Sequence, residues 1–251
     1  KIKNKGIEKV TAKKVFSRRW HEEIKAYELD DKKFNLPKGI KDSLRLNASV
    51  ISVAARFNHK NSLEVFNFWK KVETNVVEAG WVGDRLLPNS GQQLVGALDF
   101  FSEKENIHIK NEAEKLLSQF DLGLDSLEIV KEKRDNSLNI KVRMAHTFGG
   151  DKEYLPMQYE SSGTKQLLVL LQTILLVLAN GGIAILDEFD VNLHPEIVSA
   201  LFDLFLQVET NPKNAQLLFS SHSHLILSKL DKYQIILTEK NKKGESEAWR
   251  L

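Results

Sequence analysis

The chain of 251 residues is 42% hydrophobic and 28% charged, which is ordinary for one globular domain or two closely packed lobes. It has no cysteine, which excludes disulfides and thiolate metal sites and is compatible with a cytoplasmic, reducing environment. The net charge of +2 is too small to indicate nucleic-acid binding by itself.

The first 60 residues are basic, with 16 lysines and arginines against seven acidic residues. Residues 1–35 are expected to form short extended segments, and Pro37-Lys38-Gly39 predicts a turn. This basic part is interpreted as a solvated surface or as a contact for nucleic acid or an acidic partner. No aromatic residues interleave with the lysines to form a stacking platform, which favours the solvated surface.

Apolar residues at helical spacing predict a helical region in the first half of the chain. The helices are expected over residues 41–57, 61–76, 94–101 and 110–120. The second of them carries an aromatic stripe, which is more typical of a core or an interface than of a cofactor site. We interpret residues 1–125 as a helical lobe without evident chemistry, and residues 126–251 as a second lobe.

The second lobe begins with a predicted β-hairpin. Residues 127–133 and 138–147 form two extended runs separated by a polar turn. In the second run Leu138, Ile140, Val142 and Met144 alternate with polar residues, so one face of the hairpin is expected to be half-buried.

A polar segment, Glu160 to Lys165, precedes a helix expected from about Thr164 to Ala179. Free backbone N–H groups at a helix N-terminus, with hydroxyls and a glycine beside them, form an anion site. The same residues also suit an ordinary N-cap. A membrane span is not expected, because the longest apolar run, Thr173 to Ala179, is too short and Asn180-Gly181-Gly182 interrupts it.

An acidic pair, Asp187-Glu188, follows the apolar residues Ile183 to Leu186. Such a run suits a short strand buried on both faces, and ligands of a parallel sheet lie beyond the carboxyl ends of its strands. One carboxylate could help to hold Mg²⁺ while the other orients or deprotonates a water. Alternatively, the acids favour the positive end of a following helix.

A second polar tip is expected after the strand at 216–219, where Ser220-Ser221-His222 follows. His222 could reach a terminal phosphate, although a histidine after a strand is often a structural group. A helix is expected from Pro195 to Val208, because proline suits a first helical turn. Further strands are expected over 234–238 and 247–251.

Together these motifs resemble the C-terminal half of an ABC/SMC-type ATPase, specifically the OLD-like AAA ATP-binding proteins of bacterial phage-defence systems. The segment 160–164 resembles their signature motif, 183–188 their Walker B motif, 190–195 their D-loop, and 220–222 their switch histidine. The resemblance covers residues 145–251 and implies an α/β fold, with a mixed sheet, flanking helices and an inserted helical lobe. Glu160 and Thr164 depart from the residues that are usual in the signature.

The resemblance also implies roles for individual residues. Asp187 would anchor Mg²⁺ through water, Glu188 would be the catalytic base, and His222 would sense the γ-phosphate of ATP. The residues expected to contact ATP bound by a second copy are Ser161, Ser162, Gly163, Thr164, Asn192 and His194. An ATP-dependent dimer that hydrolyses ATP slowly would then switch or scaffold a nuclease or toxin effector.

Three other classes of protein fit these motifs less well. An OLD-type nuclease would carry a Toprim domain after Leu251, and a scaffold would bind nucleotide without significant hydrolysis. A chromosome-maintenance ATPase would need sustained heptads, which the sequence lacks.

The phosphate-binding loop of such ATPases, Gly-x-x-x-x-Gly-Lys-[Ser/Thr], is absent from the 251 residues. We expect it, together with the family's glutamine loop, on a segment before Lys1, or else this chain is part of a split or degenerate ATPase. Without the loop, the phosphates lose their backbone donors and their main cation. The 251 residues alone are therefore expected not to bind ATP tightly.

Overall fold

A computed structural model describes residues 13–76, 90–120, 123–134 and 137–251. The chain divides into two compact units after Lys70. This division differs from the sequence boundary at 125/126. The helices α4 (Ser90–Ser102) and α5 (Ile107–Gln119), which the sequence analysis assigned to the first lobe, pack against helix α6 (Ser162–Asn180) of the second unit.

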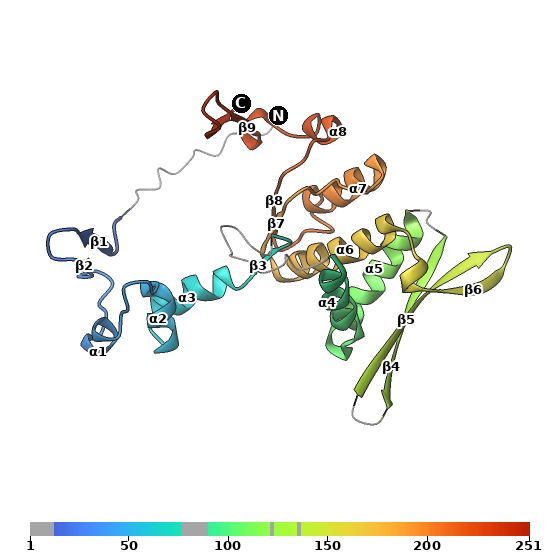
Figure 1. Ribbon diagram of the computed structural model, residues 1–251, viewed down its shortest axis with the longest axis horizontal. Coiled ribbons are helices and arrows are strands. Elements are labelled where there is room, and N and C mark those ends of the chain that lie inside the picture. Colours follow the sequence, from blue (N-terminus) through green and yellow to red (C-terminus); the bar gives the residue numbers. More distant parts are fainter. Residues whose placement is uncertain (1–12, 77–89, 121–122, 135–136) are drawn as a thin grey trace. The chain divides into compact units, whose positions relative to one another are not determined.

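The first unit contains a hairpin followed by short helices (Figure 1). Its elements are β1 (Ser17–His21), β2 (Ala26–Asp30), α1 (Lys38–Asp42), α2 (Val50–Arg56) and α3 (Lys60–Trp69). The helix predicted over 41–57 is interrupted, because the chain leaves α1 after Asp42 and the Ser49 side chain caps a new helix, α2, by accepting from Ser52 N–H. Residues 1–12 of the predicted extended segments lie outside the described residues.

Asp31 stabilises the turn between β2 and α1. Its carboxylate lies 2.9 Å from the Lys41 ammonium and accepts a hydrogen bond from the Leu36 N–H. These contacts, with that of Lys41 the larger, hold the pKa of Asp31 below its usual range. The contribution of Asp31 to stability is thus present above its unfolded-state pKa of about 4 and is lost as the pH falls through the lower folded-state pKa.

Asp31→Asn should therefore lower the free energy of unfolding at pH 7 by about 2 kcal/mol, because charged hydrogen bonds are lost. The difference from the wild type should shrink as the pH falls below about 4. Urea unfolding at pH 7 and at pH 3 measures both values. An equal loss at the two pH values would show that the charge of Asp31 is not the cause.

The second unit is built on a parallel sheet with strand order β3-β7-β8. Its strands are β3 (Val72–Thr74), β7 (Ile183–Leu186) and β8 (Gln216–Phe219). The helix predicted over 61–76 is wrong beyond Trp69, because Val72 to Thr74 pair with Ile183 to Ile185 instead. The predicted strands at 183–186 and 216–219 are confirmed.

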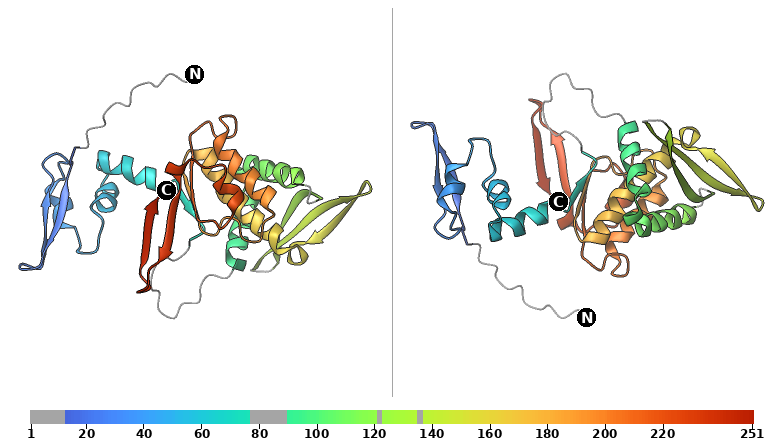
Figure 2. Two further views of the ribbon diagram at one scale, coloured as in Figure 1. Left: turned by 90° about the horizontal axis from the view of Figure 1, so that it is seen from above. Right: turned by 90° about the horizontal axis from the view of Figure 1, so that it is seen from below.

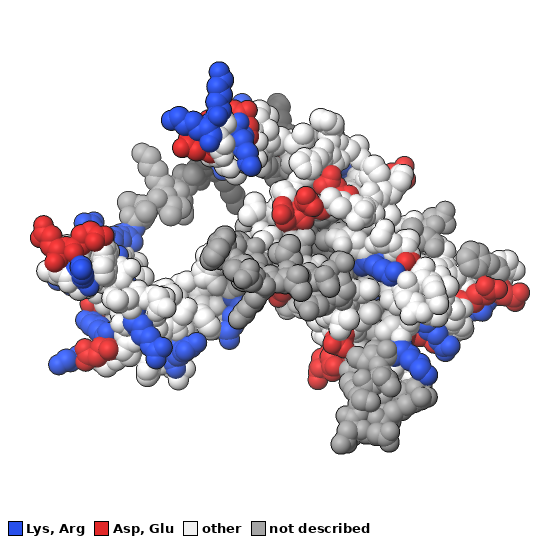
Figure 3. Space-filling view, in the orientation of Figure 1, with Lys and Arg blue, Asp and Glu red and all other residues white. Residues whose placement is uncertain are grey.

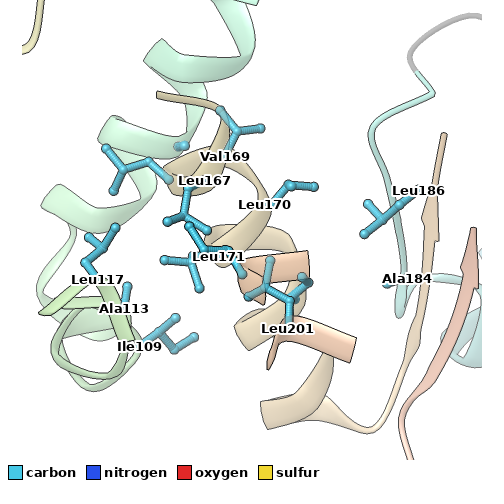
Figure 4. Close-up of a cluster of buried hydrophobic side chains, with 14 of the residues drawn as sticks. Ile109, Ala113, Leu117, Leu167, Val169, Leu170, Leu171, Ala184, Leu186 and Leu201 are labelled. Carbon is cyan, nitrogen blue, oxygen red and sulfur yellow. The ribbon is translucent and has the colours of Figure 1, made fainter. Parts of the chain in front are cut away.

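Helix α6 (Ser162–Asn180) contributes Leu167, Leu170 and Leu171 to the hydrophobic core of the second unit (Figure 4). It packs against α4 (Ser90–Ser102) and α5 (Ile107–Gln119), and α7 (Pro195–Leu206) contributes to the same hydrophobic core. By length and apolar composition α6 could cross a membrane, and 56% of its 18-residue apolar window is buried. Leu167, Leu168 and Leu171 are fully buried, so burial in the core accounts for its apolar sequence.

A second sheet is antiparallel, with strand order β4-β5-β6. It comprises β4 (Leu124–Arg134), β5 (Ser137–Phe148) and β6 (Asp151–Pro156). The predicted hairpin is confirmed as β4 and β5, with residues 135–136 of its turn outside the described part of the chain. Strand β6 was missed, because all its residues are exposed and no alternation marks it.

The chain continues from β8 into short elements. These are α8 (His224–Leu227), the 3₁₀ turn η3 (Lys232–Gln234), and the strands β9 (Ile236–Lys240) and β10 (Ser246–Arg250). Strands β9 and β10 form an antiparallel pair, seen side by side in Figure 2. They confirm the two predicted strands with shifts of one or two residues. Two further 3₁₀ turns are η1 (Lys104–Asn106) and η2 (Met157–Tyr159).

Candidate functional site

The acidic pair lies where the parallel strands β7 and β8 end. Leu186 of β7 pairs with Phe219 of β8, so the residues that follow them meet. The Ser220 hydroxyl donates to Asp187 Oδ1 at 2.5 Å and accepts from the Glu188 N–H at 2.8 Å. One serine thus fixes both the carboxylate of Asp187 and the backbone of Glu188, whose side chains are exposed.

Asn75, just after β3, binds the backbone of Asp187. Its side-chain NH₂ donates to the Asp187 carbonyl at 2.8 Å, and its side-chain oxygen accepts from the Asp187 N–H at 2.7 Å. Gln93 of α4 donates to the Asn75 carbonyl at 3.2 Å. The sequence analysis missed Asn75 because it assigned this residue to a helix. The only available signal was the β-branched pattern of Val72 and Thr74.

The backbone of Glu188 is in the left-handed region, with φ of +50°. This conformation costs a non-glycine residue about 1 kcal/mol or more, and such strain is concentrated at functional sites. The Ser220 contacts stabilise the turn, and the next residue, Phe189, is fully buried with its ring 5.3 Å from that of Phe219. Hydrogen bonds and packing therefore fix the backbone that carries the acidic pair.

The signature segment forms the N-terminus of α6. The Ser161 hydroxyl accepts from the Thr164 N–H at 3.0 Å, and the two hydroxyl oxygens lie 2.9 Å apart. Ser161 and Thr164 are thus used as an N-cap, and Thr164 is buried. Ser162 remains exposed in the first turn of the helix.

Gly163 brings the signature segment against the D-loop. A Cβ added to this residue would lie 2.9 Å from the Asn192 carbonyl oxygen, closer than ordinary contacts allow. The backbone of Asn192 is itself left-handed, with φ of +62°. Of the predicted ATP-contacting residues, Gly163 and Asn192 are therefore in contact within one chain.

The two histidines have different surroundings. His194 caps α7, because its Nδ1 accepts from the Glu196 N–H at 3.4 Å, directly before Pro195. His222 is exposed at the end of β8, two residues after Ser220, and makes no hydrogen bond to the residues that the structure describes. Its imidazole is thus free for a ligand at the same edge of the sheet.

The donor set around Asp187 fits Mg²⁺. This ion takes one or two carboxylates and keeps several waters, so it needs no dedicated protein cage. Among the described residues, no group of three or more acidic or histidine side chains could hold a metal ion. In the D-loop, Asp190 Oδ1 is buried without a hydrogen-bond partner among those residues.

Two carboxylates, a serine and a histidine thus follow the ends of two adjacent parallel strands, which is the edge of a parallel sheet where ligands bind. The family model described as "AAA domain, putative AbiEii toxin, Type IV TA system" matches residues 20–228. The chain belongs to this family of AAA domains. The predicted α/β fold class is confirmed, as is the resemblance to AAA ATP-binding proteins. No curated protein matches the chain.

Solved structures of SMC heads are similar to the chain. The SMC head bound to the C-winged helix domain of ScpA has a TM-score of 0.48 and 14% identity, over 94% of this chain and 67% of that chain. The SMC head with a coiled coil and joint from Pyrococcus yayanosii has a TM-score of 0.42 and 20% identity, over 57% and 26%. The head with an extended coiled coil bound to the C-terminal domain of ScpA, from Pyrococcus furiosus, has 0.39 and 13%, over 85% and 47%. The chain thus spans less than half of the two Pyrococcus chains.

Proposed function

We propose that this chain provides one half of an ATP hydrolase whose sites form between two copies. The observation that supports it most is the Ser220 hydroxyl, which joins the Asp187 carboxylate to the Glu188 backbone at the ends of adjacent strands. Acidic residues that only stabilised a helix end would not need a serine that fixes their carboxylate and backbone. Phosphoryl transfer, in contrast, requires carboxylates in fixed positions. Membership of the AAA family supports the same function.

In this proposal each residue has one task. Asp187, with its carboxylate oriented by Ser220, would help to hold Mg²⁺, which would supply charge neutralisation at the phosphates. Glu188, whose side chain is exposed, accepts the proton of the attacking water. His222 donates to the γ-phosphate from the neighbouring strand end.

The contact between signature and D-loop supports a site shared by two copies. The packing of Gly163 on Asn192 gives one surface on which Ser162 is exposed, and Tyr159 beside it is 68% exposed. A second copy would place its phosphate loop against this surface.

Tight ATP binding needs the phosphate loop, which the 251 residues do not contain. We expect these residues alone to bind ATP no more tightly than millimolar, because the described site offers carboxylates and a histidine but no cradle of backbone donors. Isothermal calorimetry with Mg²⁺ and ATP measures this. Micromolar binding would contradict the proposed division of the site.

The biological role follows from the family and remains part of the proposal. A cytoplasmic ATPase of this kind would switch a toxin or nuclease effector in defence against phage, in agreement with the toxin–antitoxin description of the family. An OLD-type nuclease with a Toprim domain and a scaffold that binds ATP without hydrolysing it are the alternatives. Hydrolysis by the full-length protein distinguishes the scaffold from both others.

The hairpin β1–β2 of the first unit is a candidate contact surface for nucleic acid. The sequence showed no stacking platform, yet the hairpin places Trp20 and Tyr27 together, with ring centroids 5.0 Å apart and about 40% of each side chain exposed. The Arg18 guanidinium lies 3.9 Å from the centre of the Tyr27 ring. On the face shown in Figure 3 basic and acidic side chains of this unit are interspersed, so stacking would contribute more than charge.

Trp20→Ala should weaken binding of a short single-stranded oligonucleotide about tenfold, as the loss of one stacked base implies. Fluorescence anisotropy of the labelled oligonucleotide measures the change. Trp249→Ala, at an equally exposed tryptophan on β10, is the matched control and should have no effect. Equal affinities for all three proteins would eliminate the hairpin as a nucleic-acid contact.

A further inference from the structure

Glu160 directly precedes the N-cap of α6, and its side chain is only 5% exposed. Its carboxylate Oε1 lies 2.7 Å from Nε2 of His146, whose side chain is 12% exposed. A carboxylate buried to this extent needs a specific partner. Burial of an unpaired carboxylate is costly, and the histidine provides the compensating bond.

His146, the partner of Glu160, lies beside a β-bulge in the second sheet. His146 belongs to the central strand β5, and the β4 strand opposite has a bulge between Leu124 and Ser126, at the point where Leu124 pairs with His146. Bulges change the direction of nearby side chains and increase the local twist. Beside the bulge, the Thr147 hydroxyl donates to the Asp125 carboxylate, which fixes the extra residue.

The His146–Glu160 bond therefore closes a loop of the chain. Strand β6 and the turn η2 lead from β5 to Glu160, and the bond returns Glu160 to β5. The orientation of the α6 N-terminus then depends on the Ser161 cap, on the Lys165 ammonium, which donates to the Gln158 carbonyl, on the packing of Gly163 on Asn192, and on this bond. The last of these connects the signature segment to the second sheet through two side chains, those of Glu160 and His146.

We propose that His146 is a positioning residue, which fixes the signature segment 160–164 to the second sheet in the orientation that closes on ATP held by a second copy. This role rests on the proposed function. It predicts that the first turn of α6 becomes mobile when the bond is removed, while the far end of α6, which is packed in the core, does not change.

The test uses the full-length protein carrying Glu188→Gln, with His146→Ala, His146→Gln, and His108→Ala as the matched control. Hydrogen exchange of residues 159–168 should rise at least fivefold in His146→Ala. The protein concentration for half-maximal ATP-dependent assembly, measured by light scattering, should rise about tenfold at unchanged ATP affinity of the subunit. His146→Gln keeps a donor and should restore most of both. His108, which is exposed on α5, should be neutral.

A double variant, His146→Ala with Glu160→Leu, distinguishes two roles of His146. One is to position the signature segment, and the other is only to pair with the buried carboxylate of Glu160. Replacing both partners by apolar groups should return the melting temperature close to that of the parent, whereas assembly should remain weakened. Assembly at the parent level in this variant, or unchanged exchange in His146→Ala, would overturn the proposal. If the parent itself does not assemble with ATP, the proposed function fails, and the exchange measurement still decides the role of His146.

Discussion

Gly182→Ala is expected to lower the free energy of unfolding by about 3 kcal/mol, the upper end for an overpacked core. A Cβ at Gly182 would lie 2.0 Å from the Lys71 carbonyl oxygen, so backbone would have to move. That carbonyl accepts from the Ile183 N–H at 3.1 Å, and the Gly182 carbonyl accepts from Gln216 at 2.9 Å. The methyl group would thus disturb the starts of β3, β7 and β8 together.

Thermal unfolding followed by circular dichroism measures this effect, and a fall in Tm of about 6–12 °C is expected for a chain of this size. Gly96→Ala is the matched control. Gly96 lies inside α4 with open space around its Cβ position, so alanine should stabilise the protein by about 0.5–1 kcal/mol. Equal stabilities of the two variants would mean that β3 does not approach Gly182 as closely as the structure shows.

Glu188→Gln should reduce the hydrolysis rate of the full-length protein at least 100-fold, because glutamine has the shape of glutamate but cannot accept the proton. The backbone contact to Ser220 does not depend on the side chain, so the turn should be preserved. The effect is expected in kcat, with KM for ATP changed little, because the lost interaction belongs to the transition state.

Phosphate release under saturating Mg²⁺ and ATP measures this rate. Glu209→Gln is a suitable control, because this exposed residue lies in the loop after α7. Its rate should equal that of the wild type. Undiminished hydrolysis in Glu188→Gln would show that another group accepts the proton, and a wild type without hydrolysis would favour the scaffold.

The elements that carry the acidic pair were predictable from local sequence. A four-residue apolar run between Gly181-Gly182 and Asp187-Glu188 has few structures other than a buried strand, and β7 is that strand. Strand β3 was not predictable, because Val72 to Thr74 continue the apolar pattern of α3. Their partner, β7, is more than 100 residues away in sequence, so only the tertiary structure shows the pairing.

Prediction of the site residues was limited in the same way, because local sequence does not reveal long-range contacts. Asn75 was missed because its role depends on that long-range pairing. Of the two interpretations of the signature segment, the N-cap is confirmed for Ser161, while the anion site stays a prediction, with Ser162 exposed beside the cap. For His194 the structure shows a helix cap, which its position before Pro195 allowed but did not require. Its predicted contact with ATP stays a prediction.

The most direct test of the account is the mass of full-length Glu188→Gln and wild-type protein, measured by light scattering with and without ATP. A base variant that binds ATP but does not hydrolyse it should remain closed on the nucleotide. We therefore expect the variant to form a dimer or larger assembly only with ATP, while the wild type returns to monomers as ATP is consumed. A mass that does not depend on ATP in either protein would contradict a site shared between two copies.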